Sequence, residues 1–136
     1  MNAQTGTEKK TILLVDDDED YVLQTRMQLE SAGFAVVTAG SLSEADQRLA
    51  ESNPDLVVAD LMMEVLDAGF VFCHHVKKRN PKTPVILVTA VTSETGLEFE
   101  NASGEERSWI KADAILTKPV RSEQLRREIS RLLSPG

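Results

Sequence analysis

Short apolar runs alternate with amphipathic segments along most of this chain, from Thr11 onward. Each run holds three or four apolar residues in succession and predicts a buried strand, because a bounded run of that length is too short for a typical helix. We expect five strands, at residues 11–16, 34–38, 55–60, 85–89 and 113–117. Strands that are apolar along nearly their whole length indicate a parallel sheet covered on both faces.

The segments between the strands repeat their apolar residues at intervals of three or four, which is the spacing of one helix face. We expect helices at residues 19–32, from Ser41 to the Asn53-Pro54 break, at 68–79, from near Gly104, and at 121–133. Ser41 and Glu44 have the spacing of a capping box, and Gly33 marks a helix end. The inner face of the first helix is expected to carry Val22, Leu23, Met27 and Leu29.

This alternation predicts an α/β fold, a doubly wound five-stranded parallel sheet with helices on both faces. Such sheets bind ligands beyond the carboxyl ends of the strands, where the strand order reverses. The length suits one domain, which we expect over residues 11–134. Residues 1–10 are polar and without periodicity, so they predict a flexible tail.

Composition and charge narrow the class of protein. The 136 residues are 41% hydrophobic and 27% charged, with a net charge of −7. A negative balance disfavours direct binding of nucleic acid, which needs a basic face. No apolar stretch approaches the roughly 18 residues of a membrane span, and residues 1–10 lack the apolar core of a signal peptide. We therefore expect a cytoplasmic protein without a membrane partner, whose single cysteine, Cys73, is a buried thiol.

Three acidic residues stand where two of the apolar runs end. Asp16 and Asp17 follow the first run, and Asp60 ends the third. Carboxylates are costly to hold together without a cation, because like charges raise each other's pKa. Mg²⁺ prefers oxygen ligands of this kind, and Lys118, after the fifth run, supplies a fixed positive charge. The pattern predicts a site that handles phosphoryl groups.

Over about residues 11–134 the chain resembles the receiver domain of bacterial response regulators, the CheY-like phosphoacceptor domain of two-component signalling. Four motifs carry the resemblance, each at the end of a predicted strand: Val15-Asp16-Asp17, Asp60-Leu61-Met62-Met63, Thr89-Ala90 and Lys118-Pro119. The resemblance implies the flavodoxin-like strand order 2-1-3-4-5 and a phosphorylation switch rather than an enzyme.

The resemblance also implies a role for each residue of these motifs. Asp60 is the phosphoacceptor, which forms an acyl phosphate. The expected Mg²⁺ ligands are Asp16, Asp17, Asp60 and the backbone carbonyl of Met62, where Asp17 ligates directly and Asp16 either ligates or holds a metal-bound water. Lys118 pairs with Asp60 and then with its phosphoryl group, while Thr89 donates its hydroxyl to a phosphoryl oxygen. The Lys118-Pro119 peptide bond is expected to be cis.

The implied partners are a histidine kinase or a histidine phosphotransfer protein, as phosphoryl donor, and a downstream effector protein. We expect no second domain after Pro135-Gly136, so that output would pass through a partner or through self-association. A homodimer would use the fourth helix, the fifth strand and the fifth helix of the fold. Phosphorylation is expected to shift this surface between two conformational states.

The chain departs from the family pattern at several positions. Glu64 replaces a proline after the phosphoacceptor strand, Ala68 is an insertion in the same loop, and Ile115 stands where an aromatic switch residue is frequent. The connection from the fourth strand to the fifth is also long. Met62 and Val91 occupy two positions that affect hydrolysis of the acyl phosphate in this family. Both are apolar, so neither can orient an attacking water by hydrogen bonding. We therefore expect the phosphorylated state to persist longer than in receivers with polar residues there.

Other functions remain open from the residues alone. An aspartate-nucleophile phosphatase of the haloacid dehalogenase type has Asp-x-Asp after an apolar strand, as Asp16 and Asp18 have here, but Asp20 departs from its motif. Such an enzyme would be phosphorylated on Asp16. A flavodoxin-like flavin carrier is disfavoured, because these acids would repel its phosphate. A receiver fold that signals without phosphorylation is kept open by Glu64.

Overall fold

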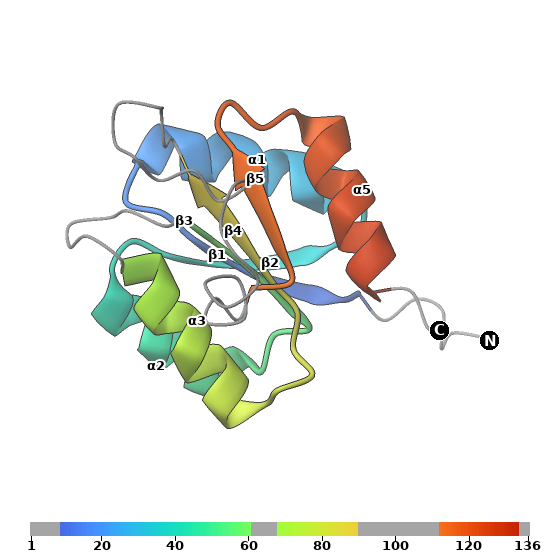
Figure 1. Ribbon diagram of the computed structural model, residues 1–136. Coiled ribbons are helices and arrows are strands. Elements are labelled where there is room, and N and C mark those ends of the chain that lie inside the picture. The colour runs from blue at the N-terminus through green and yellow to red at the C-terminus, as the bar shows by residue number, and fades with distance from the viewer. Residues whose placement is uncertain (1–8, 61–67, 90–111, 134–136) are drawn as a thin grey trace.

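Five parallel strands form the centre of the molecule, with helices against both faces (Figure 1). The computed structural model describes residues 9–60, 68–89 and 112–133, without the side chains of residues 68–70. The strands are β1 (Thr11–Val15), β2 (Ala35–Ala39), β3 (Leu56–Asp60), β4 (Val85–Thr89) and β5 (Ala114–Thr117). The helices are α1 (Glu19–Ser31), α2 (Leu42–Ser52), α3 (Ala68–Arg79) and α5 (Ser122–Leu133). The helix predicted from near Gly104 lies outside the described residues, as do Met62, Glu64 and Val91.

The strands are arranged in the order β2-β1-β3-β4-β5, and every neighbouring pair is parallel. This confirms the predicted fold class and strand order. The order reverses between β1 and β3, because the chain leaves β1 for the β2 edge and then returns to the other side of β1. A crevice at the carboxyl ends of these two strands is therefore where a ligand is expected.

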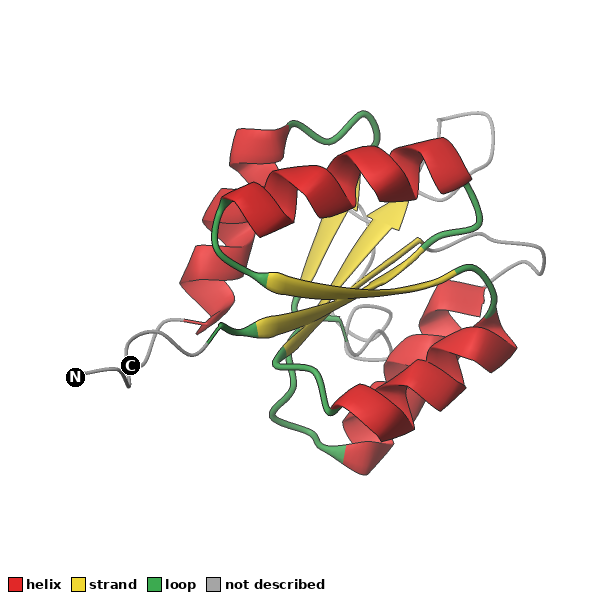
Figure 2. Cartoon of the chain, turned by 180° about the vertical axis from the view of Figure 1, so that it is seen from behind, coloured by secondary structure: helices red, strands yellow, loops and turns green. Residues whose placement is uncertain are grey.

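The core has two layers, since successive residues of a strand point to opposite faces of the sheet. Helices α1 and α5 cover one face, and α2 and α3 cover the other, as the view from behind also shows (Figure 2). The layer under α1 and α5 includes Ile12, Leu14, Val58, Ile86, Leu125 and Ile129. Cys73 lies in the other layer, 1% exposed, which confirms the predicted buried thiol. Within the described ranges, no helix is both long and apolar enough to cross a bilayer.

Local signals in the sequence account for several helix ends. The Asp18 side chain caps α1 by accepting hydrogen bonds from the backbone N–H groups of Asp20 and Tyr21. At α2 the Ser41 hydroxyl accepts the backbone N–H of Glu44 at 3.1 Å. The Glu44 carboxylate reaches back to the backbone N–H of Gly40, one residue before the cap, so that the capping box is confirmed with a shifted second bond.

The predicted inner face of α1 is partly wrong. Leu29 is buried and Val22 is half-buried, but Leu23 and Met27 are 57% and 61% exposed. The polar residue Thr25 takes the buried position instead. Leu23 and Met27 are each two residues from Thr25, about 200° around the helix at roughly 100° per residue. They therefore face away from the sheet.

Two leucines of α1 provide a test of this orientation. The variant Leu29→Ala is expected to lower the free energy of unfolding by about 2–4 kcal/mol, because it empties space in a close-packed layer. The matched variant Leu23→Ala is expected to change it by less than about 0.5 kcal/mol, because that side chain is largely in water. Urea denaturation followed by circular dichroism measures both. Equal losses would mean that the apolar face of α1 is assigned wrongly.

Candidate functional site

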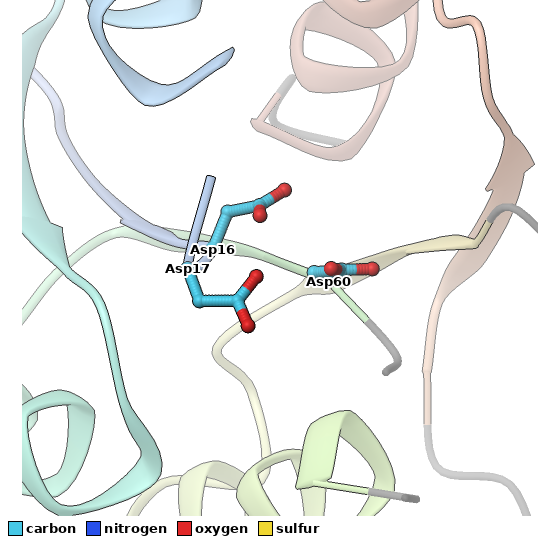
Figure 3. Close-up of side chains that lie close together, drawn as sticks. All are labelled: Asp16, Asp17 and Asp60. Atoms are coloured by element: carbon cyan, nitrogen blue, oxygen red, sulfur yellow. The ribbon is translucent and has the colours of Figure 1, made fainter. Parts of the chain in front are cut away.

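Three carboxylates meet at the point where the strand order reverses. Asp16 and Asp17 directly follow β1, and Asp60 is the last residue of the neighbouring strand β3 (Figure 3). One carboxylate oxygen from each residue lies within 4.8 Å of those of the other two. Asp16 and Asp60 are buried, whereas Asp17 is exposed. The structure thus brings together the three acids that the sequence analysis singled out.

Hydrogen bonds from neighbouring backbone hold Asp16 in place. Its own N–H donates to the carbonyl oxygen of Ala39, at the end of β2, over 3.0 Å. One of its carboxylate oxygens, Oδ1, accepts the backbone N–H of Asp18 at 2.9 Å. The same carboxylate therefore turns its second oxygen, Oδ2, to a different partner.

That partner is Lys118, which follows β5. Its ammonium nitrogen Nζ donates to Asp16 Oδ2 at 3.1 Å and lies 3.7 Å from Asp60 Oδ2. The family resemblance implied pairing with Asp60; the structure shows both pairs, with the shorter contact to Asp16. The backbone N–H of Lys118 also donates to the carbonyl oxygen of Thr89 at 2.7 Å. The expected cis Lys118-Pro119 bond is present.

The alternation of side chains along the strands explains why the side chains of Asp16, Asp60 and Lys118 lie on one face of the sheet. Asp16, Asp60 and Lys118 each lie two residues beyond a strand residue of the layer under α1 and α5. Those residues are Leu14, Val58 and Leu116. Because side chains two apart point to the same face, the three polar side chains continue that face past the strand ends.

The charges of the site do not balance. One ammonium against three carboxylates leaves a formal double negative charge among these four groups. Burial lowers the pKa of Lys118, but the hydrogen bond to Asp16 and the negative charges of Asp16 and Asp60 raise it by more. The pKa of Lys118 thus lies above its ordinary value, and the side chain is charged at neutral pH.

Thr89 is the last residue of β4 and is buried, 2% exposed. Its neighbour Val88 is in register with Asp60, which places Thr89 one step further along, at the same edge of the sheet as the acids. On its other side Thr89 is in register with Thr117 of β5, the residue before Lys118. The predicted Met62 ligand lies outside the described residues.

Sequence reasoning missed one residue of the site, Tyr21. It lies in the first turn of α1, and its half-buried ring has its centroid 4.7 Å from Lys118 Nζ. The side chain of Thr25, one turn further along the helix, is close enough to the Tyr21 hydroxyl to lower its pKa. A polar pair four residues apart, directly after an acidic strand end, was the available signal.

Tyr21 is the only tyrosine of the chain, so its titration can be followed by tyrosinate absorbance. Burial raises its pKa, Thr25 and the charge of Lys118 lower it, Asp16 and Asp60 raise it, and the net shift is upward from 10.0. We expect the variant Lys118→Met to raise the midpoint further, because the positive charge that favours tyrosinate is removed. Circular dichroism at each pH checks that the fold persists. A midpoint that stays the same or falls would contradict the contact.

Comparison with known proteins places this geometry in a family. The family model described as response regulator receiver domain matches residues 12–130. Among curated proteins, the alkaline phosphatase synthesis transcriptional regulatory protein PhoP of Bacillus subtilis is 32% identical over 124 residues, which is 91% of this chain and 48% of that protein. The chain thus spans about half the length of this relative.

Solved structures agree with the sequence match. A response regulator receiver domain protein from Clostridium thermocellum is 27% identical, with a TM-score of 0.77 over 91% of this chain and 94% of that chain. The response regulator TrrA from Thermotoga maritima, in complex with Mg²⁺-BeF, is 25% identical, with a TM-score of 0.73 over 91% and 99%. With the strand order and the acids at its switch point, these matches show that the chain belongs to the response regulator receiver domain family.

Proposed function

We propose that this chain is a phosphorylation switch in which Asp60 accepts a phosphoryl group in a Mg²⁺-dependent reaction. The donor would be a phosphohistidine of a histidine kinase or of a histidine phosphotransfer protein. One observation carries the proposal: buried Asp60 lies among two further carboxylates and the ammonium of Lys118, at the switch point of the sheet. Membership of the receiver family supports it, and gives the phosphatase and flavin-carrier alternatives no support.

The donor set fits Mg²⁺. Carboxylate oxygens are the hard ligands that this ion prefers, and the formal charge of −2 at the site would be neutralised by one divalent cation. Asp16, Asp17, Asp60 and the backbone carbonyl of Met62 would hold the ion. When bound, Mg²⁺ would supply positive charge that offsets the anionic phosphoryl oxygens near the carboxylates. The Mg²⁺-BeF complex of TrrA supports this assignment.

In the proposed reaction a carboxylate oxygen of Asp60 attacks the phosphorus atom of the donor. The bond from phosphorus to the imidazole nitrogen breaks, the nitrogen keeps the electron pair and takes up a proton, and an acyl phosphate forms on Asp60. The Lys118 ammonium, already 3.7 Å from Asp60, would neutralise charge on the phosphoryl oxygens. The Thr89 hydroxyl would donate a hydrogen bond to one of them.

The strands β4 and β5 connect the phosphorylation site to the surface formed by β5 and α5. Lys118 is tied through its backbone to Thr89, so the ends of β4 and β5 are joined by a 2.7 Å hydrogen bond. A phosphoryl group that draws both side chains inward would act on β5 and on α5, which begins at Ser122. We propose that this surface, together with the helix predicted from near Gly104, which lies outside the described residues, meets a downstream effector protein or a second copy of the chain. A histidine kinase donor implies a cytoplasmic location.

The proposal is tested by incubating the chain with acetyl phosphate and Mg²⁺, with and without excess EDTA, and measuring the intact mass. We expect the mass of one phosphoryl group to appear with Mg²⁺ and to be absent when EDTA is in excess. Equal uptake in both would contradict the metal requirement. Absence of uptake with Mg²⁺, from acetyl phosphate and from a phosphorylated phosphotransfer protein alike, would contradict the switch itself.

A further inference from the structure

Lys118 has to cross much of the sheet to reach its partners. It follows β5, an edge strand, while Asp60 ends β3 and Asp16 follows β1, so that β4 and β3 lie between the lysine and Asp16. A lysine side chain is a flexible stem that loses rotamer freedom when its end is fixed. The lysine's position over the two carboxylates therefore depends on what else contacts it.

The Tyr21 ring is such a contact. Its centroid is 4.7 Å from Lys118 Nζ, within the range of a cation–π interaction. The ring approaches from α1, which covers the sheet face to which Asp16, Asp60 and Lys118 belong. Two carboxylates and one aromatic face thus surround the ammonium group, whose three N–H donors suit several partners at once.

The surroundings of Tyr21 restrain it. Its backbone N–H is one of the two groups capped by the Asp18 carboxylate, at 3.2 Å. The side chain of Thr25, which is 5% exposed, is close enough to the Tyr21 hydroxyl to lower its pKa. The capped backbone and the half-buried position of the ring restrict its movement. The ring therefore provides a restrained surface in contact with the ammonium end of the flexible lysine.

We propose that Tyr21 is a positioning residue for phosphoryl transfer, acting through Lys118. The ring keeps the ammonium group over Asp16 and Asp60, where it meets the incoming phosphoryl oxygens. This inference rests on the proposed function and adds a residue from α1 to the site. In the part of the chain that the structure describes, the aromatic contact to Lys118 comes from α1.

The test compares rates of phosphorylation by acetyl phosphate at saturating Mg²⁺ for Tyr21→Leu and Tyr21→Phe. The variant Tyr21→Leu removes the aromatic face, and we expect it to react about three- to tenfold more slowly than the wild type. The variant Tyr21→Phe loses the hydroxyl but keeps the ring, so it should retain most of the rate. Equal rates for wild type and Tyr21→Leu would overturn the inference, as would equal losses in the two variants.

A double-mutant cycle separates positioning from a general loss of structure. In a Lys118→Met background, Tyr21→Leu is expected to have no further effect on the rate, because the group on which the ring acts is gone. A full loss that persists in that background would mean that Tyr21 acts elsewhere. If the wild type takes up no phosphoryl group, the proposed function fails; if it does and the variants match it, only the role of Tyr21 fails.

Discussion

The variant Asp60→Asn is expected to take up no phosphoryl group from acetyl phosphate and Mg²⁺, under conditions in which the wild type takes up one. An amide has the shape of the carboxylate but lacks the anionic oxygen that attacks phosphorus. The variant should be at least as stable as the wild type, because it removes one of three crowded negative charges while Lys118 keeps its shorter contact, to Asp16. Intact-mass measurement and urea denaturation give the two readings.

Asp18 provides the matched control. It lies beside the site, is exposed, and caps α1 through its side chain. The variant Asp18→Asn removes a carboxylate but retains a good capping residue, and it should be phosphorylated as the wild type is. If Asp60→Asn is stable and still gains a phosphoryl group, then Asp60 is not the acceptor.

The variant Lys118→Met is expected to move two properties in opposite directions. Phosphorylation should slow by at least about tenfold, because the ammonium that meets the phosphoryl oxygens is lost. Binding of Mg²⁺ should tighten by about tenfold, since the removed positive charge lies 3.1 Å from Asp16 and 3.7 Å from Asp60 and opposes a second cation there. Calorimetric titration measures the affinity, and acetyl phosphate kinetics measure the rate.

The control for this pair of measurements is Lys78→Met. Lys78 is exposed near the end of α3. Its substitution removes the same charge as Lys118→Met does, at a position away from the acids. It should leave both properties near the wild-type values. If Lys118→Met weakened both phosphorylation and Mg²⁺ binding, its ammonium would be a structural support of the acids rather than a competitor of the ion.

Much of the fold follows from the apolar pattern because the pattern has a simple physical origin. Strands β3 and β4 are buried along their whole length, so every residue is apolar up to the final Asp60 or Thr89. Turn and cap chemistry then set the helix limits: Gly33 and Asn53 both adopt positive φ where α1 and α2 have ended. These signals act over a few residues and can be recognised in the sequence.

The orientation of α1 could not be predicted in the same way. Its apolar residues spread around the helix, and the buried position at Thr25 is polar, so the hydrophobic pattern alone does not choose a face. The choice depends on what lies beneath the helix. Thr25 is buried in spite of its polar side chain, so apolarity does not mark the face of α1 that packs on the sheet.

The acids and the lysine of the site were predictable, but their pairing and the contact with Tyr21 were not. Asp16, Asp60 and Lys118 could be recognised as site residues because each stands at the end of a predicted strand. The carboxyl ends of parallel strands meet at one edge of the sheet. The closer approach of Lys118 to Asp16 depends on the backbone N–H of Asp18, which holds one carboxylate oxygen and turns the other to the lysine. Such a bond is set by local geometry that residue types do not reveal.

The most direct test of the central claim is the location of the phosphoryl group. The chain is phosphorylated with acetyl phosphate and Mg²⁺, the acyl phosphate is reduced with borohydride, and tandem mass spectrometry of peptides identifies the aspartate that was reduced. The result expected is reduction at Asp60 alone. Reduction at Asp16, as an aspartate-nucleophile phosphatase would give, or at any position other than Asp60, would contradict the account.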